Sequence, residues 1–182
     1  MSGLALFRRS QWFVAAALVA GTLASGAHAA DTVPGRASDS QIRGRMLDLV
    51  NAARSRSRTC GTERYAATDP LTSSRKLNEA ATSHARDMAR KKYFDHRGAD
   101  GSQPGDRVRR AGYQPRISGE NIAFGPESVE EVVEGWLASP GHCANIMEPR
   151  FKHLGVGVAT GARRGRIYWV QTFGAPLPGH RP

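Results

Sequence analysis

Two histidines and one glutamate are the side chains of this chain best suited to chemistry. His96 follows the aromatic pair Tyr93-Phe94, Glu120 lies in a Gly-Glu-Asn-Ile stretch, and His142 lies in a Ser-Pro-Gly-His-Cys stretch. Two neutral imidazoles and one carboxylate suit the first shell of Zn²⁺, with a fourth position open to water. Such a metal lowers the pKa of its bound water and supports hydrolysis. The spacing is not that of a local helical metal motif, so this chemistry depends on the fold bringing the three groups together.

The same three residues also have structural interpretations. Glu120 could accept hydrogen bonds from backbone amides and hold a turn, because a buried carboxylate without partners is costly. His142 could cap or orient a short helical turn, with Asn145 bonding the surrounding loop. His96 is the hardest of the three to explain as scaffold, since it lies in a polar, glycine-rich loop.

Other residues of the same types are interpreted as structure. His84 lies on the apolar face of a helical segment and is expected to pack there. His153 precedes a strand and is expected at the surface or edge, whereas Tyr93 and Phe94 are expected in the core. Ser139 lies three residues before His142 and permits a Ser/His hydrolase, although no strand–nucleophile–helix elbow surrounds it.

The chain has two cysteines, Cys60 and Cys143. An even count in an exported chain predicts one disulfide. This bond closes a loop of more than eighty residues and contributes about 4 to 5 kcal/mol in the chain-entropy model. The alternative is that Cys143, beside His142, is a nucleophile or a metal ligand.

The first thirty residues have the pattern of a signal peptide. Arg8 and Arg9 precede an apolar run at residues 12–23, and small residues lead to a cleavage site near Ala29. Arg8-Arg9 also permits twin-arginine export, but the residues that follow favour an ordinary basic start. Because the run is short and no later segment reaches about 18 apolar residues, we expect a secreted or periplasmic protein that is not an integral membrane protein.

The net charge of the chain is +10, of which the two arginines of the signal peptide contribute two. A surface this basic favours anionic partners such as acidic lipid headgroups or wall polymers. The positive residues are dispersed along the sequence, so they also serve solubility. No nucleic-acid motif is present, so no specific nucleic-acid binding is expected. About 150 mature residues suffice for one domain, and we expect a monomer.

The hydrophobic periodicity predicts helices first and strands last. A helix is expected around residues 42–50, followed by a loop at 54–70. Further helices are expected at 75–92, 106–111 and 128–137, and alternating strands at 154–158 and 167–173 joined by a hairpin at 161–165. Ser40 or Asp39 could cap the first helix, and Ser128 with Glu131 forms a capping-box pattern. This order favours an α+β fold.

Three motifs resemble those of the CAP superfamily, the cysteine-rich secretory, antigen 5 and pathogenesis-related proteins, in its bacterial form. They are residues 93–96, 119–122 and 136–146, and the resemblance extends from Met46 to Gly174. It implies a three-layer α-β-α sandwich with a further strand at 121–124. The expected organisation is a signal peptide at 1–30, a leader at 31–40, the CAP-like domain at 41–176 and a tail at 177–182.

The resemblance also implies a central cleft. Members often place two histidines and two glutamates there, and His96, Glu120 and His142 match three of these positions. No glutamate follows Trp136 at the fourth position, so Ser139 or water would complete a site for zinc or another divalent metal. Asn121 and Asn145 join the expected cleft as further lining residues.

Two functions follow as expectations from the resemblance. One is a secreted binding module for sterols, fatty acids or an anionic envelope component, recognisable by an exposed apolar groove beside basic loops. The alternative is a metal-dependent hydrolase, a peptidase or nuclease, with Glu120 as ligand or general base. Enzymatic activity is left open by the sequence.

Overall fold

The computed structural model describes residues 37–161 and 166–180. These residues belong to one compact unit, Arg36–Pro182. The predicted signal peptide, its cleavage site near Ala29 and most of the predicted leader lie outside the described residues. Within the described ranges, no helix is long and apolar enough to cross a membrane.

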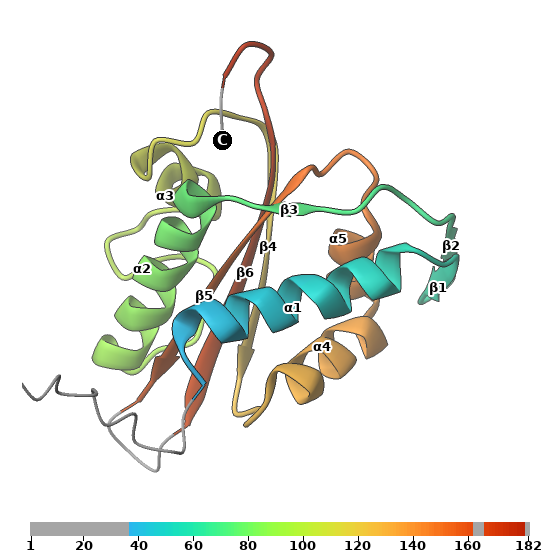
Figure 1. The fold of residues 1–182 in the computed structure, drawn as a ribbon. Coiled ribbons are helices and arrows are strands. Elements are labelled where there is room, and N and C mark those ends of the chain that lie inside the picture. The colour runs from blue at the N-terminus through green and yellow to red at the C-terminus, as the bar shows by residue number, and fades with distance from the viewer. Residues whose placement is uncertain (1–36, 162–165, 181–182) are drawn as a thin grey trace, which may run out of the picture. The chain divides into compact units, whose positions relative to one another are not determined.

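A four-stranded sheet forms the middle layer of the unit (Figure 1). Its strands, in spatial order, are β3 (Thr72–Ser73), β5 (His153–Thr160), β6 (Ile167–Pro176) and β4 (Pro115–Phe124). The pairs β5–β6 and β6–β4 are antiparallel, and β3 is parallel to β5. The predicted pairing of the last two strands and the strand at 121–124 are confirmed, and β4 starts six residues earlier than expected. Most of the predicted connection at 161–165 lies outside the described residues.

Helices cover both faces of this sheet (Figure 1). One face carries α2 (Arg75–Lys91) and α3 (Pro104–Arg110), and the other carries α1 (Asp39–Arg54), α4 (Val129–Ala138) and α5 (Pro140–Met147). The alternation in β6 explains both layers: Trp169 and Phe173 pack with α1, α4 and α5, whereas Tyr168 and Val170 pack with α2. The predicted α+β sandwich is confirmed.

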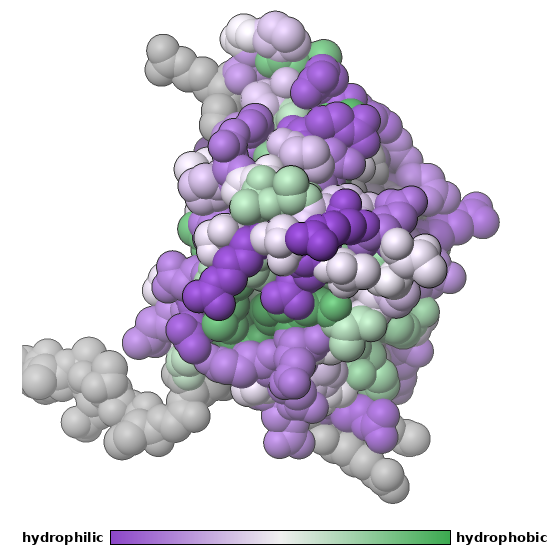
Figure 2. Space-filling view, turned by 90° about the vertical axis from the view of Figure 1, so that its right-hand side faces the viewer, coloured by the Kyte–Doolittle hydropathy of each residue, from purple (hydrophilic) through white to green (hydrophobic). Residues whose placement is uncertain are grey.

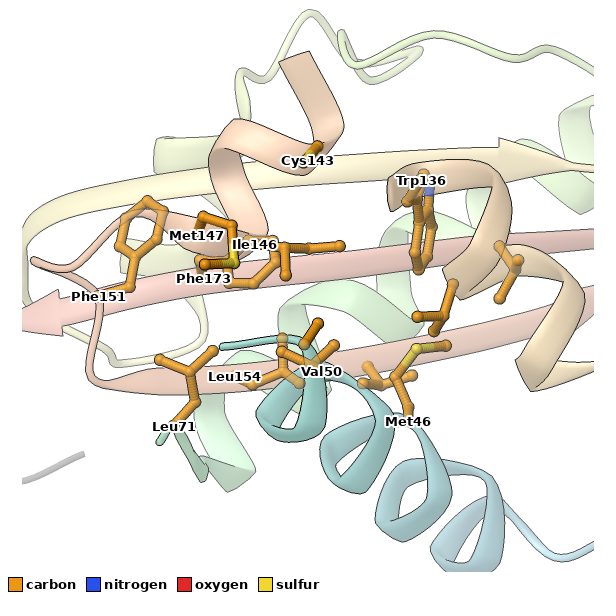
Figure 3. Packing of buried hydrophobic residues seen from close by; sticks show 14 of the residues in the cluster. Met46, Val50, Leu71, Trp136, Cys143, Ile146, Met147, Phe151, Leu154 and Phe173 are labelled. Carbon is orange, nitrogen blue, oxygen red and sulfur yellow. The ribbon is translucent and has the colours of Figure 1, made fainter. Parts of the chain in front are cut away.

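The larger core lies between the sheet and the layer formed by α1, α4 and α5. Figure 3 shows side chains of these helices, among them Met46, Trp136 and Ile146, meeting Leu154 and Phe173 of the sheet. On the opposite face, α2 lies so close to β5 that a Cβ atom at Gly155 or Gly157 would overlap the helix backbone. Glycine is therefore required at these two positions by the close approach.

Serine side chains start three of the helices. Ser38 caps α1 and forms a capping box with Gln41, one residue before the expected Asp39. Ser74 accepts from Leu77 N at the start of α2. Ser128 accepts from Glu131 N at the start of α4, but the Glu131 carboxylate accepts from Glu127 N, so the predicted capping box is only half formed.

The segment expected as a loop at 54–70 contains a small hairpin, β1 (Arg58–Cys60) and β2 (Glu63–Tyr65). Two three-residue strands are too short to produce a detectable alternation, which is why the sequence did not indicate them. The predicted disulfide between Cys60 and Cys143 is confirmed and joins β1 to α5 across 83 residues. The alternative role of Cys143 as nucleophile or metal ligand is therefore wrong.

The prediction that Phe94 belongs to the core is also wrong. Its side chain is 48 % exposed and contacts the ring of Phe124, which is itself exposed. The reason is that α2 ends at Lys91 and its C-cap, Lys92, has a left-handed backbone with φ of 60°, so Phe94 lies beyond the helix and does not continue its buried face. Tyr93, by contrast, is partly buried against the α2 layer and donates to Asp87.

Candidate functional site

Three elements bring the predicted cleft residues toward one another. His96 lies in the loop between α2 and α3, Glu120 lies in the middle of β4, and His142 lies in the first turn of α5. The Glu120 side chain is 3 % exposed and the His96 side chain 47 % exposed. The carboxylate thus lies beneath an imidazole that faces solvent.

The Glu120 carboxylate is held by side chains rather than by backbone amides. Its Oε1 atom is 2.9 Å from Nδ1 of His96, and Arg107 Nη2 donates to both oxygens, at 3.0 and 2.8 Å. Nε2 of His84 lies 3.9 Å from the same Oε1 atom. The expected backbone role of Glu120 is replaced by a buried ion pair with Arg107.

The sequence reasoning missed Arg107, which it counted among the dispersed surface charges. Its side chain is 7 % exposed, and it also donates to Ser102 O at 3.0 Å and His96 O at 2.8 Å. The chemistry of Glu120 could have pointed to this partner, because a buried carboxylate needs a cationic or hydrogen-bonding group beside it. The short helix at 104–110 supplies several arginines for that role. Arg107 therefore fixes both the carboxylate and the loop that carries His96.

His84 supports the same loop. The predicted packing role is consistent with its burial, 1 % exposed, and Nε2 of its ring lies 2.9 Å from Asp95 O. A carbonyl oxygen only accepts, so Nε2 carries the proton and Nδ1 is the bare nitrogen of the neutral ring. Burial lowers the pKa of His84, which favours this neutral form.

The two cleft histidines have opposite electrostatic environments. The hydrogen bond to Glu120 raises the pKa of His96 from its usual 6.5. Burial, together with the nearby charge of His96, lowers the pKa of His142. The charge of His96 therefore acts on the ring of His142. His96 is disposed to donate hydrogen bonds, whereas His142 is disposed to accept them.

Two asparagines connect the elements that carry these groups. Asn145 Nδ2 donates to Glu120 O at 3.2 Å and to Asn121 Oδ1 at 2.8 Å. Asn121, which is fully buried, donates in turn to His142 O and to Gln171 Oε1. Both asparagines thus hold α5 against β4. Ser139 lies at the N-cap of α5, and its side chain makes no capping bond.

The donor set suits a metal ion only in part. Among residues 37–161 and 166–180, no group of three or more His, Cys, Asp and Glu side chains is arranged to hold a metal ion. Both Glu120 oxygens accept from Arg107, whose positive charge opposes a cation beside the carboxylate. Direct ligation by Glu120 would require this pair to open, which leaves the imidazoles of His96 and His142 as the accessible donors.

A groove of about 550 Å³ lies between α1 and α4. Its apolar lining comes from Leu49, Ala52, Ala53, Val133, Leu137 and Ala138. Arg56 and Arg58 line it as well, together with Glu130 and Glu134. Figure 2, which views the side on which α1 ends and α4 lies, shows a hydrophobic hollow with hydrophilic residues around it. The partly buried Arg58 has an Nε atom with no hydrogen-bond partner among the described residues.

Comparison with known proteins gives one consistent result. The profile of the cysteine-rich secretory protein family, CAP, matches residues 47–173. The Bacillus subtilis protein YkwD, which is uncharacterized, is 34 % identical over 142 residues, covering 78 % of this chain and 50 % of YkwD. This chain therefore spans about half the length of that relative.

Solved structures with the same fold include two bacterial surface or extracellular proteins. An extracellular protein of Bacillus anthracis that contains an SCP domain has a TM-score of 0.62 and 26 % identity, covering 77 % of this chain and 44 % of its own. An outer surface protein of Borrelia burgdorferi has a TM-score of 0.59 and 18 % identity, covering 74 % of this chain and 89 % of its own. The second likeness concerns the fold alone.

Proposed function

Because this chain belongs to the CAP family of cysteine-rich secretory proteins, we propose that it is an exported binding module that holds an anionic lipid between α1 and α4. The groove between these helices is the observation that carries the proposal. Export is supported by the signal-peptide pattern, by the disulfide, which is typical of oxidising compartments, and by the extracellular relative from Bacillus anthracis.

The groove has the two parts that such a ligand needs. Its volume, about 550 Å³, falls within the range of small-molecule sites, and each methylene buried on its apolar floor contributes about 0.8 kcal/mol. The unpartnered Nε–H of Arg58 provides a donor for a carboxylate or phosphate oxygen. We therefore place the hydrocarbon along the floor and the headgroup at Arg58.

The first test measures displacement of dansyl-undecanoic acid by palmitate. Ala52 is exposed and lines the groove, so Ala52→Trp is expected to fill the space and weaken binding at least about tenfold. The control is Ala66→Trp at an exposed position outside the groove. Equal affinities in the two variants, or no saturable binding to the unmodified protein, would overturn the proposal.

The second test separates the headgroup from the hydrocarbon. Arg58→Gln removes the positive charge and the Nε–H donor but leaves the apolar floor intact. We expect palmitate to bind at least about fivefold more weakly and hexadecanol to bind unchanged. A parallel loss for both ligands would show that Arg58 supports the fold of the groove and does not recognise the headgroup.

A divalent metal at His96 and His142 is the second candidate, favoured by the contact between His96 and Glu120. The Nδ1 atom of His96 faces Glu120, which directs Nε2 away from the carboxylate. A carboxylate behind a histidine in this way is the usual support of a metal-ligating imidazole. When bound, the metal would supply Lewis-acid chemistry. The protein's own residues would hold it through two imidazoles, with Glu120 orienting one of them.

Zinc calorimetry on the metal-stripped protein tests this candidate. One-to-one binding should weaken strongly in His142→Ala and remain in His180→Ala, whose exposed histidine lies near the C-terminus. Equal zinc binding by both variants would contradict a metal site in the cleft. The metal-dependent peptidase or nuclease stays a prediction, and it would require a measured turnover that folded His142→Ala loses.

A further inference from the structure

A second groove, of about 730 Å³, follows the outer surface of α2 on the face of the sheet opposite to α1 and α4. Six cationic side chains other than Arg107 line it: Arg43, Arg75, Arg86, Arg90, Lys91 and Arg110. Four of these residues come from α2 itself, one from α1 and one from α3. Charges that are dispersed in sequence thus gather along one helix.

The carboxylates in this groove do not balance the cations. Glu79 pairs with Arg75, Asp100 pairs with Arg110, and Asp87 is shared by Arg90 and Lys91. The Arg107 charge is offset by Glu120, and Arg43 lies 3.8 Å from Asp39. Arg86 is exposed, and the described residues give it no ion-pair partner. Six cations against the three lining carboxylates leave the groove positive.

The remaining lining is polar and not hydrocarbon. Asn78, Thr82, Ser83 and Ser102 contribute hydroxyl and amide groups, and no aliphatic or aromatic hydrocarbon side chain is among the lining residues. The lining also includes His84 and Arg107, whose Nδ1 and Nε atoms are buried without a hydrogen-bond partner among the described residues. Nδ1 accepts and Nε–H donates, so a hydroxyl group has the chemistry to satisfy either atom.

We propose that this groove binds a phosphorylated polyol. Guanidinium groups form paired hydrogen bonds with phosphate oxygens, and the groove presents five of them besides that of Arg107. The hydroxyl and amide groups suit the polyol, whereas a hydrocarbon ligand finds no apolar floor here. This site is separate from the groove between α1 and α4. His84 and Arg107 also support the histidine cleft, whereas Arg86 and Arg90 on α2 belong to this groove alone.

The test is calorimetry with myo-inositol hexakisphosphate at about 150 mM salt, where weak charge attraction is screened. We expect saturable binding that Arg86→Gln weakens at least about fivefold and Arg86→Gln/Arg90→Gln at least about tenfold. The matched control is Arg64→Gln/Arg150→Gln. Arg64 is exposed, as Arg86 is, and Arg150 is ion-paired, as Arg90 is, but neither lines the groove.

Binding in the control within about twofold of the unmodified protein supports the proposal. Equal weakening in both double variants would show general attraction to a basic protein and overturn the site. If inorganic phosphate or a DNA oligonucleotide binds as tightly as myo-inositol hexakisphosphate at equal phosphate concentration, the groove does not recognise the polyol. That result would overturn this part of the proposal. Unphosphorylated inositol is expected to show no binding, and saturable binding of it would overturn the role given to phosphate.

Discussion

The buried ion pair between Glu120 and Arg107 is the residue-level contact on which the histidine cleft depends. Arg107 neutralises the carboxylate and donates to His96 O, so the same guanidinium sets the charge beneath the cleft and the path of its loop. Removing one partner of such a pair leaves an uncompensated charge in a poorly solvated place. The pair is a structural requirement of the cleft before any ligand is considered.

Glu120→Gln is therefore expected to lower the free energy of unfolding by about 3 kcal/mol, because the Arg107 charge stays buried without its partner. Urea denaturation followed by circular dichroism measures this change. The double variant Glu120→Gln/Arg107→Met should recover part of the loss, since it removes both charges. A single variant within about 0.5 kcal/mol of the unmodified protein, the usual surface effect, would contradict the burial of the pair.

The two cleft histidines should titrate on opposite sides of 6.5. We expect an NMR titration of the metal-free protein to place the pKa of His96 above this value and that of His142 below it. A raised folded-state pKa means that the His96–Glu120 contact stabilises the fold below pH 6.5 and that this contribution is lost as pH rises through the raised value. The pKa of His96 in Glu120→Gln should return toward 6.5, and an unchanged value would exclude Glu120 as the cause.

At the scale of elements, the contact of α2 with β5 positions the cleft. Gly155 and Gly157 let the helix lie directly on the strand, and α2 then ends where its left-handed Lys92 directs the chain toward His96. The close contact of helix and strand leaves no room for a side chain between them. The loop thus takes its position from packing that occurs several residues before the histidine.

Gly157→Ala is expected to cost about 2 to 3 kcal/mol of stability, because its Cβ would overlap the backbone of Ala81 and force the helix away. Gly135→Ala is the matched control on α4, where the exposed glycine has no neighbouring atom within 4 Å. This second change should stabilise the protein by about 0.5 to 1 kcal/mol through helix propensity. Thermal unfolding of both variants measures the difference, and equal effects would contradict the close contact.

At the scale of the whole unit, the three layers present two grooves on opposite faces of one sheet. The groove between α1 and α4 is apolar with charges around it, and the groove along α2 is polar and positive. The disulfide adds a long-range connection, because it ties the β1 hairpin, which carries Arg58, to α5. Its loss is therefore expected to affect both stability and the groove between α1 and α4.

Replacing both cysteines by serine is expected to lower the free energy of unfolding by about 4 kcal/mol, since a loop this long is released in the unfolded chain. In a unit of this size, this corresponds to a melting temperature lower by about 10 °C. Calorimetry with and without a dithiol reductant measures the change. The serine variant should not respond to reductant, and an unchanged melting curve of the unmodified protein under reductant, with free thiols confirmed, would contradict the prediction.

Local pattern in the amino-acid sequence was enough to predict the longer helices and strands, the disulfide and the family, but not the short strands β1, β2 and β3. The helical period at 75–92, the alternation at 154–173, the two cysteines and the three motifs carry these predictions, and all of them are confirmed. Local periodicity holds this information because neighbouring side chains on a helix or strand must face the same core.

Which charges are buried and which surfaces are hollow was decided by the folded arrangement alone. In the sequence, Arg107 is one of several arginines in a basic stretch, and only the fold places it beneath Glu120. The two grooves likewise join α1 to α4, and α2 to α1 and α3, across segments far apart in the chain. Burial and charge pairing depend on distances between elements, and these distances are absent from any local pattern.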